Sequence, residues 1–309
     1  MITVIVCTHN PRDDYFARTL SGLREQTLNR SSWELIIVDN ASQNPISTTI
    51  DITWHHRARV VREDRIGLTA ARLRGIDEAQ GQLLIFVDDD NILERNYLLI
   101  AQKQWLSMPW LGTWGGKVEP EFETPPPIWI KTYLPLLAIN EVRCDQWSNF
   151  TDPSSTPPCG AGMCVRIQAA KRWSESVRQS SLRISLGRTG TSLASGEDID
   201  LAFTACDLGL ATGRFTALKL THLIPKERLE LKYMSRLVES VAESQVLLRS
   251  LRENIVPAPP ARLRARLLEL WHDWRRGPEE RALLRAERKG RASGFTKLRS
   301  TQSTLSQSN

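Results

Sequence analysis

The chain has 309 residues, of which 41% are hydrophobic and 25% are charged, a composition typical of a folded protein with one large domain and an appendage. Its longest uninterrupted apolar run, Leu83 to Val87, is far shorter than the ~20 residues that a helix needs to cross a bilayer, which excludes a transmembrane segment. Residues 261–300 hold twelve Lys or Arg against five Asp or Glu, so the net charge of +6 resides in that stretch. The remainder is close to neutral and is not expected to bind nucleic acid.

The spacing of the cysteines and the N-terminal residues bear on the cellular compartment of the protein. Five cysteines without a CxxC pair argue against a disulfide framework and against a zinc site. A strand-like segment, Ile2–Cys7, follows Met1 directly and leaves no room for a signal peptide. We therefore expect a reduced, cytoplasmic protein.

The first part of the chain alternates strand-like and helical segments. Helical spacing of apolar residues predicts helices at Tyr15–Glu25 and Leu68–Ala79. Apolar runs predict strands at Ile2–Cys7, Glu34–Asp39, Arg59–Arg62 and Gln82–Val87. This alternation predicts an α/β fold with a mainly parallel central sheet flanked by helices, which binds its ligand at the carboxyl ends of the strands.

The amino-acid composition changes after residue 107, where proline- and tryptophan-rich segments predict loops. The later elements predicted are strands at Ala161–Arg166 and Ala217–Thr221 and helices at Asp198–Leu208, Leu229–Asn254, Ala261–Arg276 and Glu279–Lys289. We expect a main domain over residues 1–228, divided into halves at about 1–106 and 107–228, then a basic helical extension over 229–300 and a disordered tail over 301–309.

Three carboxylates, those of Asp88, Asp89 and Asp90, follow a strongly apolar predicted strand. Clustered anions repel one another unless they share a cation, so the cluster predicts a divalent metal with oxygen ligands, Mn²⁺ or Mg²⁺. The alternative is an exposed acidic turn or a helix N-terminus.

Polar residues also follow the first two predicted strands, with Thr8 and Asn10 after the first and Asp39 and Ser42 after the second. Their amides, hydroxyls and carboxylate suit a uracil edge and ribose hydroxyls at one rim of the sheet. Each of these residue types is by itself also common in turns.

These segments, in this order and spacing, resemble the family 2 glycosyltransferases. The similar segments are the opening strand and turn at 3–10, the second strand and turn at 34–42, the Gly-loop and following helix at 63–72, and the DxD motif at 86–90. The resemblance covers about residues 1–228, and it implies a GT-A (Rossmann-like) catalytic domain whose first half binds the nucleotide and whose second half binds the acceptor.

The resemblance also implies roles for individual residues in nucleotide-sugar binding. Thr8 and Asn10 would line the base pocket, Asp39 would face the nucleoside, and Ser42 and Gly67 would belong to the same site.

In the DxD segment, Asp88 would lie near the ribose and the metal, Asp89 would belong to the nucleotide-sugar site, and Asp90 would hold the metal itself. Arg72 would point toward the nucleotide, although a solvated helix face is its alternative.

An acidic pair, Glu197 and Asp198, resembles the motif that supplies the catalytic base in this family. Inverting transfer needs one carboxylate to take the proton of the acceptor hydroxyl, and Asp198 is the candidate. Glu197 would hold the acceptor or the helix start. The alternative is that both acids cap the helix that begins there.

A further segment, residues 222–228, follows a strand-like stretch. His222 would complete the metal shell, as a histidine recurs in the matching family segment. Lys226 and Arg228 would form a lid that stabilises the diphosphate. A structural role is the alternative for His222.

The motifs together predict a non-processive, inverting, metal-dependent glycosyltransferase, since the QxxRW motif and membrane helices of processive relatives are missing. The expected donor is a nucleotide diphosphate-sugar, with UDP or dTDP favoured over GDP, and the expected acceptor is a sugar or a lipid-linked glycan. Two alternatives stay open: a nucleotidyltransferase, although no Gly-rich phosphate loop follows the first strand, and a degenerate GT-A domain that acts as a non-catalytic partner.

Two aromatic features complete the predictions. Trp129 and Trp147 would form an apolar platform for the acceptor sugar, or else lie in the core. Residues 261–289 combine leucines and tryptophans with arginines at helical spacing, a pattern that predicts peripheral contact with an anionic membrane. Packing against the protein's own domain or a second subunit is the alternative.

Overall fold

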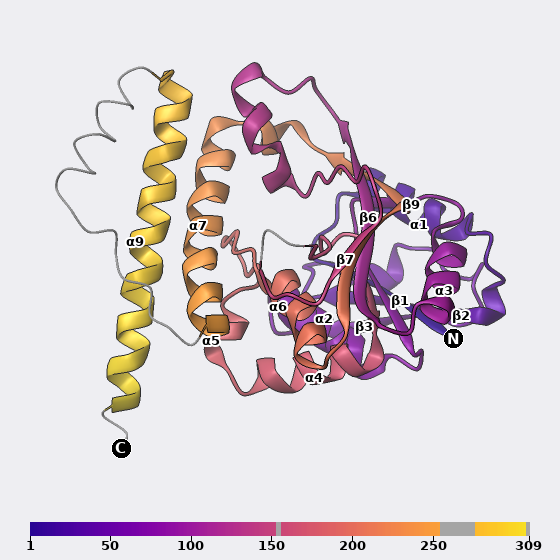
Figure 1. Ribbon diagram of the computed structural model, residues 1–309. Helices are drawn as coiled ribbons and strands as arrows, with labels where there is room; N and C mark the ends of the chain where they lie inside the picture. The colour runs from indigo at the N-terminus through magenta and orange to yellow at the C-terminus, as the bar shows by residue number, and fades with distance from the viewer. Residues whose placement is uncertain (153–155, 254–275, 307–309) are drawn as a thin grey trace.

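The computed structural model describes residues 1–152, 156–253 and 276–306 (Figure 1). Its strands are β1 (Ile2–Thr8), β2 (Trp33–Asn40), β3 (Ala58–Glu63), β4 (Leu83–Asp88), β5 (Asn91–Leu93), β6 (Leu111–Phe122), β7 (Gln146–Ser148), β8 (Cys164–Arg166) and β9 (Ala211–Ile224). Its α-helices are α1 (Asp13–Arg24), α2 (Leu68–Glu78), α3 (Tyr97–Ser107), α4 (Ile167–Arg178), α5 (Ser181–Ile184), α6 (Glu197–Asp207), α7 (Leu231–Glu253) and α9 (Pro278–Ser306). Short 3₁₀ helices are η1 (Arg30–Ser32), η2 (Ile46–Thr48), η3 (Ile128–Leu137) and η4 (Lys226–Leu229).

The strands form one sheet in the order β3-β2-β1-β4-β8-β6-β9-β5, with β7 paired to β9. The long strands pair in parallel, whereas the short strands β5, β7 and β8 pair antiparallel. This arrangement confirms the predicted α/β class with a mainly parallel central sheet. The first four predicted strands and two predicted helices are each found within two residues of their expected bounds.

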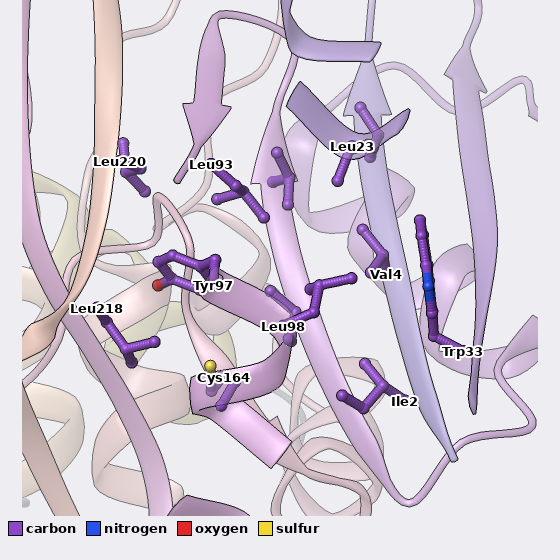
Figure 2. Packing of buried hydrophobic residues seen from close by; sticks show 14 of the residues in the cluster. Ile2, Val4, Leu23, Trp33, Leu93, Tyr97, Leu98, Cys164, Leu218 and Leu220 are labelled. Atoms are coloured by element: carbon purple, nitrogen blue, oxygen red, sulfur yellow. The ribbon is translucent and has the colours of Figure 1, made fainter. Parts of the chain in front are cut away.

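Two apolar layers cover the two faces of the sheet, because successive side chains of a strand point to opposite faces. In β1, Val4 and Val6 pack in the layer with α1 and α3, whereas Ile5 and Cys7 pack in the layer with α2, α4 and α6. Figure 2 shows part of the first layer, where Trp33 lies beside β1 and Tyr97 of α3 lies between Leu93 and Cys164. Burial on both faces explains why these strands read as continuous apolar runs.

Helices α7 and α9 lie side by side beside the sheet domain and run in the same direction (Figure 1). Leu283, Ala286 and Leu298 of α9 are buried in this pairing. A Cβ at Gly290 would lie 2.0 Å from the carbonyl oxygen of Glu239, so glycine allows the two backbones to approach closely. The prediction that the helix ends near Lys289 is wrong, since α9 continues to Ser306. Gly294, the other glycine within α9, also lies against α7, where a Cβ would be 2.8 Å from Val246.

The predicted helix at 261–276 falls almost wholly outside the described residues. The described remainder of the 261–289 segment belongs to α9 and packs on α7 of the same chain, in agreement with the alternative of packing on its own domain. Among the described helices, none has the length and apolarity required to cross a membrane.

Candidate active site

A cleft of about 630 Å³ opens at the carboxyl ends of β1 and β4. One wall is formed by these strand ends and the start of α2, and the other by the start of α6, the preceding loop at 187–196, η3, η4 and α7. The turn Asp88–Asp90 and the distant Asp198 both line this cleft. The two acidic groups singled out in the sequence are therefore brought together.

Asp90 is held against β9 because β5, which follows it directly, pairs with that strand. Asn91 lies opposite His222 in this pairing, and the amide of Leu223 donates to the carbonyl oxygen of Asp90 over 2.9 Å. As a result, Oδ2 of Asp90 lies 3.4 Å from Nε2 of His222 and 2.9 Å from Nη2 of Arg228.

The three carboxylates of the turn have different environments. Burial raises the pKa of Asp88, and burial together with the charge of Asp90 raises the pKa of Asp89 to about 7. Asp89 accepts a short hydrogen bond from the hydroxyl of Thr8. Burial also acts to raise the pKa of Asp90, but His222 and Arg228 outweigh it and hold that pKa below its ordinary value. Asp90 is therefore the carboxylate of the turn that is ionised most readily.

The donors around Asp90 suit a divalent metal that is shared with a substrate. Nε2 of the buried His222 lies 3.4 Å from Oδ2 of Asp90 and 3.0 Å from Nη1 of Arg228, whereas its Nδ1 has no hydrogen-bond partner in the described part of the chain. Within those residues no group of three or more His, Cys, Asp or Glu side chains forms a ready metal site. Mg²⁺ typically takes one or two protein carboxylates and completes its shell with water and substrate phosphates, so a partial protein site fits this chemistry.

Arg72 joins the two walls of the cleft. Its Nη1 lies 2.7 Å from Oε1 of Glu197, its Nη2 lies 4.0 Å from Asp88, and its guanidinium lies over the ring of Phe86. Glu197 also accepts a short hydrogen bond from the hydroxyl of Thr69. Arg72 and Glu197 are both buried, and burial raises the pKa of Glu197, with Arg72 acting against it. The pair is thus a buried, mutually compensated charge pair.

Asp198 differs from Glu197 in that its carboxylate is only partly buried. Its Oδ1 accepts from the amide of Ile199 over 2.9 Å, at the start of α6, and its Oδ2 accepts from the amide of Gly160 over 3.1 Å. A Cβ at Gly160 would lie 2.7 Å from Nη2 of Arg72 and 3.3 Å from Cβ of Asp198, so a side chain there would displace both groups. Two backbone amides therefore orient a carboxylate that lines the cleft.

Of the predicted nucleotide-binding residues, Thr8 and Gly67 line the cleft, whereas Asn10, Asp39 and Ser42 are not among its lining residues. The latter three tie the loops after β1 and β2 together: the amide of Asn10 donates to Oγ of Ser42 over 2.9 Å, and the amide of Ser42 donates to Oδ1 of Asp39 over 3.1 Å. Asp39 also forms an ion pair with Arg62 at 2.8 Å. In this structure Asn10, Asp39 and Ser42 therefore stabilise the loops beside the cleft.

The structure also separates some residues that were expected together. The side chain of Lys226 is exposed and is not among the cleft-lining residues, in contrast to Arg228. Neither Trp129 nor Trp147 lines the cleft. Trp147 instead forms an exposed ring pair with Trp110, with ring centroids 6.4 Å apart.

A charged residue of the cleft, Arg188, was missed in the sequence. Arg188 lines the cleft from the loop that precedes α6. The only signal is a single arginine in a polar stretch of small residues a few positions before Glu197, which is too weak to find by inspection.

The sheet and its cleft define a GT-A fold. The family model for Glycosyl transferase family 2 matches residues 3–160, about half of the chain. The chain belongs to this family, as the ordered motifs predicted.

The comparisons agree with that assignment. EpsH of Bacillus subtilis is 29% identical over 98 residues, which are 31% of this chain and 28% of that protein. The mannosyltransferase PcManGT from Pyrobaculum calidifontis, solved with GDP-Man and Mn²⁺, has a TM-score of 0.56 and 20% identity over 98% of this chain and 79% of that chain. TarS of S. aureus in complex with UDP has a TM-score of 0.50 and 14% identity over 100% of this chain and 92% of that chain. The two structures share the fold, and the matched segments span less than a third of the curated relatives.

Proposed function

We propose that this chain is a non-processive inverting glycosyltransferase that moves one sugar from a nucleotide diphosphate-sugar to an acceptor hydroxyl, in polysaccharide or glycoconjugate synthesis. Family membership supports the reaction class. The observation that carries the proposal is that Asp88–Asp90 and Asp198 line one cleft at the carboxyl edge of the sheet.

In the proposed step, Asp198 takes the proton of the acceptor hydroxyl. The acceptor oxygen forms a bond to the anomeric carbon while the bond from that carbon to the diphosphate oxygen breaks, and the nucleoside diphosphate leaves with the electron pair. Asp198 suits this role better than Glu197, because Glu197 is buried against Arg72 whereas Asp198 is partly exposed to the cleft.

The charged residues of the cleft would hold the donor. Asp90 and His222, with Asp88 beside them, are the proposed holders of Mn²⁺ or Mg²⁺. A metal bound there would supply positive charge to the leaving diphosphate. Arg228 contacts Asp90 in this structure, and we propose that it turns to the diphosphate as part of a lid, with Lys226 as its exposed neighbour.

The remaining predictions on substrates and location stay proposals. Thr8, Gly67 and Asp89 would contact the nucleotide-sugar, with Asn10, Asp39 and Ser42 shaping the base pocket behind them. UDP or dTDP is the proposed nucleotide, and a sugar or a lipid-linked glycan is the proposed acceptor. We propose a cytoplasmic protein, with membrane contact through residues 261–289 as an option for lipid-linked acceptors.

The test combines a donor panel with two matched variants. The wild-type protein is incubated with UDP-, dTDP- and GDP-sugars, Mn²⁺ and sugar or lipid-linked acceptors, and released nucleoside diphosphate is measured. Asp198→Asn should lower transfer by about 10²–10⁴-fold, because the base is lost, and should leave nucleotide affinity within about twofold. Asp207→Asn, at the exposed end of the same helix, is the control and should leave transfer unchanged.

Undiminished turnover in Asp198→Asn would remove Asp198 from the role of base. If the wild-type protein binds a nucleotide but transfers no sugar from any donor, the chain is a non-catalytic GT-A domain. EDTA should stop transfer and added Mn²⁺ should restore it, and transfer that persists in EDTA would contradict metal dependence.

A further inference from the structure

Three arginines line the cleft, and two of them already have carboxylate partners. Arg72 pairs with Glu197 at 2.7 Å, and Arg228 pairs with Asp90 at 2.9 Å. The guanidinium of Arg188 has neither a hydrogen bond nor an ion pair with any residue that the structure describes. A guanidinium that lies in a polar cleft without a protein partner keeps its donors available for an anionic ligand.

The backbone that carries Arg188 is fixed on both sides. Its carbonyl oxygen accepts from the amide of Leu68 at the start of α2, over 2.8 Å. Its neighbour Gly187 lies so close to Glu197 that a Cβ there would be 2.3 Å from Oε2. Farther along the loop, the amide of Ser195 donates to Oγ of Ser244 in α7 over 3.1 Å. Arg188 therefore sits on an anchored segment between the Gly-loop and the acidic pair.

Arg188 shares its cleft with the carboxylates that face the donor site. Asp88, Asp89 and Asp90 line the same cleft as Arg188. A diphosphate would lie at this turn if the donor binds as proposed, within the cleft that Arg188 lines.

We propose that Arg188 binds the diphosphate of the donor directly and stabilises the negative charge that forms on it when the bond to the sugar breaks. This assignment rests on the proposed glycosyltransferase function. It deepens that function, because it adds a cation that is free before substrate binds, whereas Arg72 and Arg228 must share their charge with Glu197 and Asp90.

The test measures nucleotide affinity in the full-length chain by titration calorimetry with Mn²⁺. UDP, dTDP and GDP are each compared with their monophosphates in wild type, Arg188→Gln and Arg188→Lys. Arg188→Gln should weaken diphosphate binding by about 10- to 100-fold and leave monophosphate binding unchanged, because only the diphosphate reaches the guanidinium. The diphosphate affinity of Arg188→Lys should lie between those of the wild type and Arg188→Gln, since lysine keeps the charge but loses the planar donor pair. Arg172→Gln, which removes an exposed arginine of α4, is the matched control and should bind like wild type.

Steady-state kinetics with the best donor separates the remaining possibilities. A lower kcat and a higher donor KM in Arg188→Gln, at unchanged acceptor KM, support the proposal. Unchanged diphosphate affinity with a raised acceptor KM would overturn it and assign Arg188 to an anionic acceptor. A diphosphate affinity, kcat and KM values that all equal those of the wild type would overturn the proposal as well. If the wild-type protein binds no nucleoside diphosphate at all, the proposed function itself fails. This result is distinct from one in which the wild type binds and Arg188→Gln binds equally well.

Discussion

The two walls of the cleft are built in different ways. On the strand wall, parallel pairing aligns Cys7 with Val38 on one side and with Asp88 on the other, so backbone hydrogen bonds bring the ends of β1, β2 and β4 together. On the opposite wall, the loop at 187–196 and η4 are held by side chains: Ser244 holds Ser195, and Arg228 contacts Asp90. The strand wall is thus part of the fold itself, whereas the other wall depends on individual polar contacts.

Substitutions in the two walls should therefore have different effects. Substitutions in the strand wall should change the stability of the whole domain, because the sheet and the site share the same hydrogen bonds. Substitutions in the opposite wall, called the loop wall, should change catalysis or the binding of donor and acceptor at a smaller cost in stability. The following variants test that division.

The largest effect is expected at Arg72, which connects the two walls. Arg72→Met leaves the buried carboxylate of Glu197 without its partner and should lower the free energy of unfolding by about 3–5 kcal/mol. The double variant with Glu197→Gln removes the unpaired charge and should recover most of that loss. Urea denaturation of the two variants and the wild type measures both values. A single variant as stable as the wild type would show that the pair does not join the walls.

A smaller effect is expected within the strand wall at Asn40. Its amide group donates to the carbonyl oxygens of Glu63 and Arg65 at 3.1 and 2.7 Å, and its oxygen accepts from the amide of Gly67 at 2.8 Å. Asn40→Ala removes all three contacts with the Gly-loop and should cost about 1–3 kcal/mol.

The same variant should also weaken nucleotide affinity, because Gly67 lines the cleft. Thermal denaturation and nucleotide titration check the two effects. The exposed Asn44 offers a matched control, and Asn44→Ala should stay within about 0.5 kcal/mol of the wild type. Equal stability of the two asparagine variants would contradict the claim that side-chain support of the Gly-loop is part of the fold.

The smallest effect on stability is expected in the loop wall at Ser244. Ser244→Ala removes the hydroxyl that accepts from the amide of Ser195 and should cost about 1 kcal/mol. It should raise the acceptor KM and weaken nucleoside diphosphate affinity, since the loop that it holds carries Arg188 and precedes Asp198. Kinetics with varied acceptor and nucleotide titration measure the two effects, with Ser250→Ala on the same helix as the control. A loss of stability as large as that of Asn40→Ala, with both affinities unchanged, would contradict the proposed division between the walls.

Part of this protein could be predicted from local sequence alone. The first four strands and the helices between them follow from apolar periodicity and short turns, and the acidic turn Asp88–Asp90 is visible because it directly follows an apolar run. The ordered motifs were sufficient to predict the family, which the family model confirms. These features depend on residues that are close in the chain, and their signals are therefore readable in order.

Contacts between residues far apart in the chain become visible only in the folded protein. The pairing of the three-residue strand β5 with β9 brings His222 to Asp90, and a strand that short has no periodic signal. The loop before α6 brings Arg188 into the cleft through contacts with α2 and α7. In α9, Gly290 and Gly294 lie against Glu239 and Val246 of α7, so the helix continues beyond its predicted end. Each of these depends on the shape and charge of a partner far away in the chain, which a single sequence does not display.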